Sequence, residues 1–271
     1  MKDAPPPLLN RVSRKLRSFF MRSELDAYLG TMSADNPLRG LPARIVGDAS
    51  SDPTEFFTHY DAFGYWAAEK LARANRRRRI LDIGSPKTQN AILSAYHDVT
   101  AVVLADCSDK FSAVTYVQHD VTRPLPFPAG SFDCFTSTVA LQLVGLGRYG
   151  DRVDANCLPN LVSELGRVMS DEAELFVSMA LGPNLLAFNN QWCLDLETIV
   201  RVFKGWRLVD AVVDNWSSPR VGSEGDASQR FVRPEQICSV IREGDYRVVF
   251  CAFVRDPSQP RQLASHESTD A

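Results

Sequence analysis

Segments typical of buried strands alternate with segments typical of helices through most of this chain, and this alternation limits the possible folds more than any other feature. Strands are expected in seven short runs rich in apolar and β-branched residues: 79–83, 100–105, 114–118, 132–139, 174–179, 206–213 and 246–254. Helical patterns lie between them at 90–96, 158–169, 194–203 and 234–241. The order predicts an α/β fold: a doubly wound, mostly parallel seven-stranded sheet with helices on both faces.

The sequence before the first strand predicts a helix over residues 53–74, in two pieces because Gly64 interrupts the pattern. Thr54 is the candidate N-cap, since its hydroxyl can accept a free amide of the first turn. Four arginines follow at 76–79. Such a run is typical either of a phosphate or nucleic-acid patch or of a helix end, where cations suit the negative dipole. The net charge of −3 favours the helix end, because nucleic-acid binders usually carry a basic field.

The two ends of the chain differ from the middle. Residues 1–53 are expected to form an N-terminal extension with an amphipathic helix over 9–29, which carries five Lys and Arg side chains between its apolar positions. Two interpretations of this helix stay open: it binds a membrane surface or a partner protein, or it packs on its own domain with a solvated basic face. The main domain is expected over 54–254, and residues 255–271 are expected to be disordered.

Composition narrows the cellular setting. The six cysteines are scattered without a C-x-x-C pair, which argues against a disulfide framework or a zinc site. No apolar run approaches the roughly 20 residues that span a bilayer, and the N-terminus lacks a signal-peptide pattern. We therefore expect a cytoplasmic protein, with peripheral membrane contact through residues 9–29 as the alternative.

Acidic residues follow three successive predicted strands. Asp82 lies in the turn Asp82-Ile83-Gly84-Ser85, Asp106 follows the second strand, and Asp120 follows the third. Each alone is typical of a cap or turn residue. In a doubly wound sheet, however, ligands bind at the carboxyl ends of the strands, where glycine admits a ligand and an acid can hold ribose hydroxyls. Together the three acids predict a site for a nucleoside-containing ligand.

These residues carry a family resemblance. The segments 80–85, Asp106, 119–122 and 125–133 (Leu-Pro-Phe-Pro-Ala-Gly-Ser-Phe-Asp), with the helix and strand over 160–179, resemble class I S-adenosylmethionine-dependent methyltransferases. The resemblance covers roughly residues 55–254. The run Gly-Leu-Gly-Arg-Tyr-Gly-Asp at 145–151 is similar to a narrower, poorly characterised group within that superfamily.

The resemblance implies a Rossmann-like methyltransferase fold and S-adenosylmethionine as the cofactor. It implies cofactor contacts from Asp82, Gly84, Ser85, Asp106, Asp120 and Val121, and from Tyr60 or Tyr65 in the helix that folds over the cofactor. In the family, the loop after the fourth strand faces the transferred methyl group. Here that loop offers Asp151 as a base, Arg148 for an anionic substrate group, and Tyr149 beside them. A structural loop tied by an Arg–Asp pair is the alternative.

One departure from the family pattern bears on function. Where the family carries further glycines after the first strand, this chain has Pro86 and Lys87. Either the turn takes another route and holds the cofactor, with Lys87 or Ser85 near its carboxylate, or the site is degraded.

The leading prediction is an S-adenosylmethionine-dependent methyltransferase acting on a small-molecule or glycan-type hydroxyl, without a nucleic-acid substrate. The alternative is a non-catalytic methyltransferase-like scaffold or regulatory subunit, which the residues after the first turn and the helix over 9–29 would suit. A nicotinamide-dependent oxidoreductase is weaker, because G-x-G-x-x-G is absent.

Overall fold

The structure is a computed structural model. It describes residues 58–105, 110–187, 190–214, 231–236 and 246–258, together with Ser23, Asp26 and Ile241. Asp106 and most of the predicted N-terminal extension and C-terminal tail therefore lie outside the described residues. Of the helix predicted over 9–29, Ser23 and Asp26 alone are described, and both are exposed and helical.

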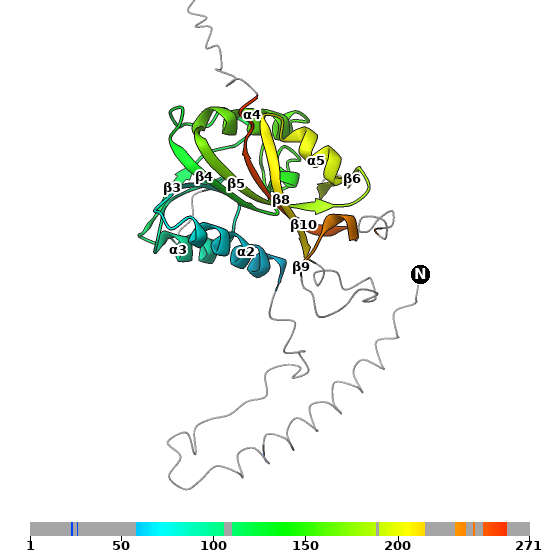
Figure 1. Ribbon diagram of the computed structural model, residues 1–271, viewed down its shortest axis with the longest axis horizontal. Helices are drawn as coiled ribbons and strands as arrows, with labels where there is room; N and C mark the ends of the chain where they lie inside the picture. Colours follow the sequence, from blue (N-terminus) through cyan, green and yellow to red (C-terminus); the bar gives the residue numbers. More distant parts are fainter. Residues whose placement is uncertain are drawn as a thin grey trace, which may run out of the picture. The chain divides into compact units, whose positions relative to one another are not determined.

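The main sheet confirms the predicted doubly wound arrangement (Figure 1). Its strand order is β3-β2-β1-β4-β5-β10-β8-β9. The strands are β1 (Arg79–Ile83), β2 (Asp98–Val103), β3 (Val114–Gln118), β4 (Phe132–Thr138), β5 (Met169–Leu181), β8 (Trp206–Asp214), β9 (Phe231–Val232) and β10 (Arg247–Arg255). The five strands from β3 to β5 are parallel, whereas β10 runs antiparallel to both its neighbours. The strand order therefore reverses between β1 and β4, because β1 pairs with β2 on one side and with β4 on the other.

The predicted count of seven strands was wrong, because the described part of the sheet has eight. The additional strand, β9, contains two residues, which is too short for an alternating pattern to reveal. A separate two-stranded hairpin, β6 (Leu185–Ala187) with β7 (Gln191–Cys193), was also missed. Both segments are shorter than the runs from which strands can be predicted.

Helices cover both faces of the sheet (Figure 1). The helices α2 (His59–Arg73) and α3 (Lys87–Ser94) lie on one face, and α4 (Cys157–Val168) and α5 (Leu196–Val202) lie on the other. Two short 3₁₀ turns, η1 (Leu141–Leu143) and η2 (Pro234–Gln236), complete the described elements. The helix predicted over 234–241 begins as η2, and residues 237–240 lie outside the described residues. Among the described helices, none is long and apolar enough to cross a membrane.

The predicted break in the first helix at Gly64 was wrong, because α2 continues through it. Glycine costs a helix about 1 kcal/mol, and the burial of Phe63, Trp66 and Leu71 against the sheet outweighs that cost. The helix also begins later than predicted. Its N-cap is Thr58, whose backbone amide donates to the Asp61 carboxylate at 2.9 Å, and Thr54 lies outside the described residues.

The core forms two apolar layers, one on each face of the sheet. Under α2 and α3, Trp66 and Phe63 pack edge-on against Phe176 and Phe250, with ring centroids 5.9 and 5.4 Å apart respectively. Under α4 and α5 the layer is larger and includes Phe203 stacked on Phe253. These layers fix the central strands, and therefore the edge where the strands end.

The arginines at 76–79 make ion pairs at the amino-terminal edge of the sheet. Arg77 reaches Asp98 at 2.6 Å, and Arg79 lies 3.5 Å from Asp133. Arg78 is buried and pairs with Glu174. These partners support the interpretation of the run as a structural element before a buried strand rather than a nucleic-acid patch.

Candidate functional site

A cavity of about 260 Å³ opens at the carboxyl ends of the parallel strands, where the strand order reverses. This is the position at which doubly wound sheets bind ligands. We call it the switch-point cavity. Its lining residues are Tyr60, Ile83, Gly84, Val102, Leu104, His119, Asp120, Val121, Thr138, Val139, Ala140, Leu143, Val144, Tyr149 and Asp151.

Gly84 forms the wall of the cavity at the end of β1, and only glycine fits there. Its φ is +80°, which side chains rarely adopt. A Cβ at this position would lie 2.3 Å from the Cβ of Ala140. The backbone of the turn is therefore bare toward the cavity, so a ligand can approach it closely.

Asp82 lies beneath the turn and does not line the cavity. Its side chain is buried, and its carboxylate accepts hydrogen bonds from Thr136 Oγ1 at 2.6 Å, Asn90 Nδ2 at 3.0 Å and the Ser85 amide at 3.2 Å. Burial raises the pKa of Asp82, and the three donors oppose that shift. Asp82 thus holds the turn in place rather than facing a ligand.

Strand β4 supplies two further hydroxyl groups to the same turn. Ser137 Oγ donates to the Ile83 carbonyl at 2.7 Å. Thr138 Oγ1 lies 3.0 Å from Ser85 Oγ and 3.1 Å from Gln89 Oε1. The segment over residues 82–86, which we call the β1 turn, is therefore fixed by side-chain hydrogen bonds where the family pattern relies on glycines.

Pro86 and Lys87 lie away from the switch-point cavity. Pro86 precedes the first residue of α3, where its fixed φ and missing amide donor are tolerated. Neither side chain lines the cavity, and Pro86 lines a different cavity between α2 and α3. The departure from the family pattern therefore leaves the space beside Gly84 open.

The segment after β3 forms another wall. The Asp120 carboxylate accepts the amide of Thr122 at 3.0 Å and that of Arg152 at 3.4 Å. Burial favours a higher pKa for Asp120, but these hydrogen bonds outweigh it and hold the pKa below its usual range. Beside it, His119 Nε2 is buried without a hydrogen-bond partner among the described residues. His119 is not among the predicted cofactor contacts, although its place next to Asp120 was a usable signal.

Val139 at the end of β4 also lines the cavity and adopts an unusual backbone conformation. Its φ is +51°, which is strained for a β-branched residue. Ser178 of the neighbouring β5 holds it there, because the Val139 amide donates to Ser178 Oγ at 2.9 Å and to the Ser178 carbonyl at 3.2 Å. Nothing in the sequence pattern indicated this strain.

The loop after β4 (residues 145–154), which we call the β4 loop, folds around the carboxylate of Asp151. That carboxylate accepts backbone amides from Gly145 at 2.8 Å, Gly147 at 3.3 Å and Tyr149 at 3.2 Å. Both glycines have positive φ, which the tight path of the loop requires. Three amides on one carboxylate favour a loop-organising role for Asp151 over its predicted role as a base.

Arg148 and Tyr149 stand at the outer edge of the β4 loop. Arg148 donates to the side-chain oxygen of Asn190, next to β7, so the predicted alternative of an Arg–Asp pair is not what is found. Its guanidinium lies 5.7 Å from the Tyr149 ring. Tyr149 is 67% exposed and Tyr60 is 42% exposed, and both line the cavity. Asn190 was missed because the β6–β7 hairpin was missed.

The structure thus gathers six of the ten predicted site residues around one cavity. Those six are Tyr60, Gly84, Asp120, Val121, Tyr149 and Asp151. Asp82 and Ser85 are joined by a hydrogen bond within the β1 turn and do not line the cavity, and neither does Arg148. Asp106 is outside the described residues.

The fold is similar to that of known structures. The structure of 1,6-didemethyltoxoflavin-N1-methyltransferase from Burkholderia thailandensis, with bound 1,6-didemethyltoxoflavin and S-adenosylhomocysteine, aligns over 94% of this chain and 93% of its own. The TM-score is 0.51 and the sequence identity is 15%. The chain has the methyltransferase fold.

Two further structures match with lower scores. An S-adenosylmethionine-dependent methyltransferase from Mesorhizobium loti aligns over 72% of this chain and 100% of its own, with TM-score 0.47 and 15% identity. A TehB-like S-adenosylmethionine-dependent methyltransferase from Corynebacterium glutamicum aligns over 73% and 98%, with TM-score 0.43 and 14% identity. No family profile matches the sequence, and no curated protein matches it.

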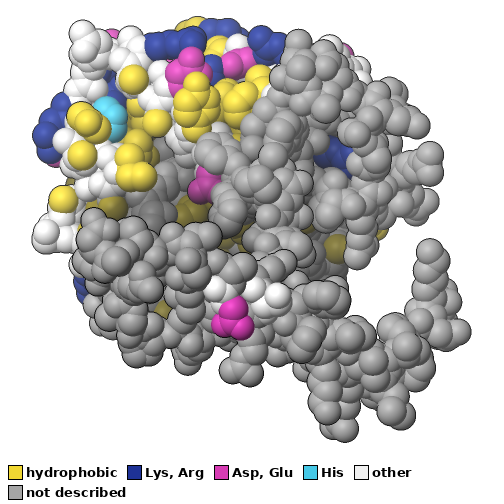
Figure 2. All heavy atoms as spheres, turned by 90° about the horizontal axis from the view of Figure 1, so that it is seen from below, with side chains coloured by type: hydrophobic (Ala, Val, Ile, Leu, Met, Phe, Trp, Pro, Cys, Tyr) yellow, Lys and Arg dark blue, Asp and Glu magenta, His cyan; other side chains and the backbone are white. Residues whose placement is uncertain are grey.

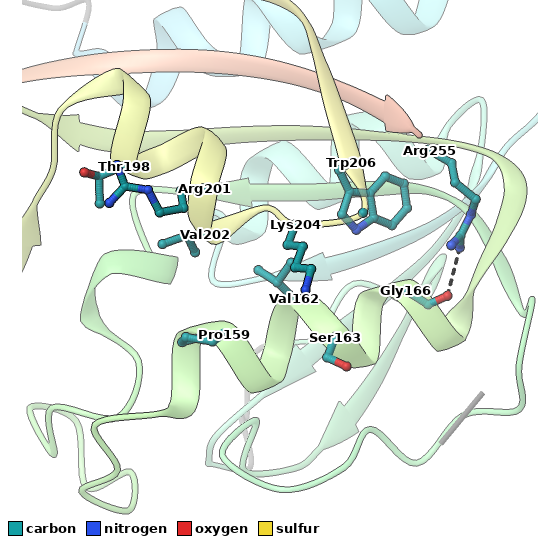
Figure 3. Close-up of a pocket in the computed structure, with 11 residues that line it drawn as sticks. Pro159, Val162, Ser163, Gly166, Thr198, Arg201, Val202, Lys204, Trp206 and Arg255 are labelled. Carbon is teal, nitrogen blue, oxygen red and sulfur yellow. Dashed lines mark hydrogen bonds between the residues drawn. The ribbon is translucent and has the colours of Figure 1, made fainter. Parts of the chain in front are cut away.

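Another cavity, of about 340 Å³, lies between α4 and α5 on the other face of the sheet (Figure 3). Its cationic side chains are largely engaged in structural contacts. Arg255 donates to the Gly166 carbonyl at 2.8 Å and lies 4.8 Å from the Trp206 ring, and Arg201 pairs with Glu197 at 2.8 Å. No predicted site residue lines this cavity, so the switch-point cavity remains the candidate site.

Proposed function

We propose that the protein is an S-adenosylmethionine-dependent methyltransferase. The observation that carries this proposal is the open switch-point cavity, which Gly84 and Asp120 line while Pro86 and Lys87 fold away from it. In a degraded site, side chains would fill that space. When bound, S-adenosylmethionine supplies an electrophilic methyl group.

The residues around the cavity suit the parts of this cofactor. Gly84 lets the backbone approach it, and Tyr60 covers it from α2. Asp120 offers a carboxylate to an exocyclic amine, with Val121 and His119 beside it. The buried Asp82 carboxylate holds the turn in place by accepting hydrogen bonds from the Ser85 amide and from Thr136. Asp106 keeps its proposed role on the ribose hydroxyls because it follows β2, as predicted.

We place the acceptor at the mouth of the same cavity, against the β4 loop. Tyr149 supplies an exposed aromatic face, and Arg148 supplies a guanidinium that can pair with an anionic group of the acceptor. We propose a small-molecule or glycan-type hydroxyl as the acceptor group. Asp151 organises the loop. The similarity of the protein to the narrower methyltransferase group with this loop sequence remains a prediction, and so does a cytoplasmic location.

Calorimetric titration with S-adenosylhomocysteine tests the proposal. The full-length chain should bind with a micromolar dissociation constant, and Asp120→Ala should weaken binding about tenfold by removing one charge-assisted hydrogen bond. Glu197→Ala on the exposed surface of α5 is the matched control and should bind as wild type does. Absence of binding by a folded wild-type chain would overturn the enzyme proposal and favour the non-catalytic scaffold.

A further inference from the structure

The helices α2 and α3, which lie on the same face of the sheet, enclose a continuous groove. One cavity of about 480 Å³ and another of about 190 Å³ both contact Ala68, Ile92 and Leu93, so they join. One side of this α2–α3 groove is a stripe of α2 residues four apart: Tyr60, Gly64, Ala68 and Ala72. Three of these four are small, and small residues along a helix allow another helix to approach closely.

Large apolar side chains border the α2–α3 groove and are open to solvent. Tyr65 is 57% exposed, Ile92 is 65% exposed and Tyr96 is 74% exposed. In the view from the side on which α2 and α3 lie, hydrophobic side chains gather in several patches, with Lys and Arg along the margin (Figure 2). Large exposed apolar side chains that border a groove typically mark an interaction site.

The groove has a positively charged end. The larger cavity is lined by Arg76, Arg77 and His97, and by no acidic side chain. Arg77 binds Asp98, whereas the ion pair of Arg76 is with the exposed Glu172 at 3.8 Å. Burial, followed by the nearby charges of Arg78 and Arg77, lowers the pKa of His97 and keeps it neutral. Each arginine therefore has one acidic partner, but the ion pair of Arg76 is long and exposed, so Arg76 can also pair with an acidic occupant.

We propose that the α2–α3 groove is the docking site for an amphipathic helix of a partner protein. The apolar face of that helix lies on the small-residue stripe of α2, between the exposed side chains of Tyr65 and Ile92. Acidic residues at one end of the helix pair with Arg76. The segment over residues 9–29 fits this end less well, because its five Lys and Arg side chains outnumber Glu24 and Asp26 and would meet like charges there.

The groove is connected to the switch-point cavity by two residues. Tyr60 lines both spaces. Gln89 lines the groove, contacts Thr138 of the cavity wall through Oε1, and has a buried Nε2 without a partner among the described residues. An occupant that pairs with this amide or orders Tyr60 therefore changes cofactor affinity, and the cofactor changes the occupant's affinity equally. This coupling rests on the proposed function, whereas the docking itself does not.

A synthetic peptide tests the docking. The probe is an 18-residue helix-forming peptide with leucines on one face and glutamates in its last turn, and its fluorescence anisotropy is followed with the full-length chain. We expect micromolar binding. Ala68→Trp fills the groove and should weaken binding at least tenfold, whereas Val200→Trp on α5 is the matched control and should not. Arg76→Glu should weaken binding about fivefold, and Lys204→Glu should leave it unchanged.

Other outcomes overturn the proposal in distinguishable ways. If a peptide with lysines in place of the glutamates binds equally well, the partner helix does not need an acidic end, and that part of the proposal is wrong. Self-association of the chain that Ala68→Trp abolishes would assign the groove to a second copy. Peptide binding that appears only after Leu16 and Phe19 are replaced by Asp would assign it to the chain's own segment.

The coupling is tested by titrating S-adenosylhomocysteine with and without saturating peptide. A change in its affinity of about threefold or more supports the coupling. Unchanged affinity overturns the coupling but not the docking. Absence of S-adenosylhomocysteine binding, with peptide binding retained, overturns the proposed function and leaves the docking site in place.

Discussion

The β1 turn and the β4 loop both border the switch-point cavity, but different groups hold them in place. The β1 turn is fixed from outside, because Thr136, Ser137 and Thr138 of β4 reach across to it. The β4 loop is fixed from inside, because Asp151 collects amides from its own loop. The first segment therefore shares the stability of the central sheet. The second depends mainly on the Asp151 carboxylate, with outside contacts from Arg148 to Asn190 and from the Arg152 amide to Asp120.

This difference matches the two tasks that the proposed function assigns. A cofactor common to many enzymes needs a wall that does not move, and buried strand-to-strand hydrogen bonds provide one. An acceptor that differs between enzymes needs a surface loop that can vary without disturbing the sheet. Substitutions in each segment test whether the two segments are energetically separate.

The largest effect is expected from Gly84→Ala. The new Cβ meets Ala140 at 2.3 Å and the backbone has positive φ, so unfolding free energy should fall by about 3 kcal/mol or more and S-adenosylhomocysteine binding should be lost. In the β4 loop, Gly150→Ala also has positive φ but meets nothing within 4 Å. It should cost about 1 kcal/mol. Urea denaturation and calorimetry measure both, and equal costs would contradict the comparison.

A smaller effect is expected from Asp151→Ala. Water can reach the freed amides of the partly exposed loop, so unfolding free energy should fall by about 1–2 kcal/mol, with S-adenosylhomocysteine affinity within about threefold of wild type. Tryptic cleavage after Arg148 should accelerate about tenfold, because the loop opens locally. The matched variant Thr136→Val should weaken S-adenosylhomocysteine binding without exposing that cleavage site. The two segments are not separate if Asp151→Ala abolishes S-adenosylhomocysteine binding.

The contact between Arg148 and Asn190 should contribute less. Both side chains are exposed, so a double-mutant cycle with Arg148→Ala and Asn190→Ala should give a coupling free energy of about 0.5–1 kcal/mol. The control is the same cycle with Glu197→Ala in place of Asn190→Ala, and it should give no coupling free energy. Coupling near zero for Arg148 and Asn190 would mean that this contact adds nothing to the support that Asp151 gives the loop.

The sequence predicted the strands well because their β-branched runs are long enough to show a pattern. It predicted the position of β1 to the residue, and it predicted the edge of the sheet at which the switch-point cavity opens. It failed at Gly64, where core packing outweighs helix propensity, and at the β6–β7 hairpin, whose strands contain three residues each. Local propensity does not reveal contacts that the tertiary structure supplies.

The prediction of site residues was coarser than that of strands. An acid at a strand end predicts which edge of the sheet it occupies, but not the direction of its side chain. Asp120 lines the cavity and Asp82 turns inward to Thr136, although the two had the same sequence signal. The role of Asp151 depends on three amides that the folded loop brings together. Such convergence is visible only in three dimensions.

The smallest effect is a difference in pH dependence, which again distinguishes the two segments. Burial raises the pKa of Asp82 in the folded protein above its unfolded value. The folded state therefore binds more protons in that window, and the contribution of Asp82 to stability declines as pH rises from about 4 through the raised pKa. Asp82→Asn should remove this decline, whereas Asp151→Asn should keep it. Urea denaturation between pH 4 and pH 7 measures the slopes. Parallel slopes in wild type and Asp82→Asn would mean that the buried carboxylate of the β1 turn has no net linkage to folding.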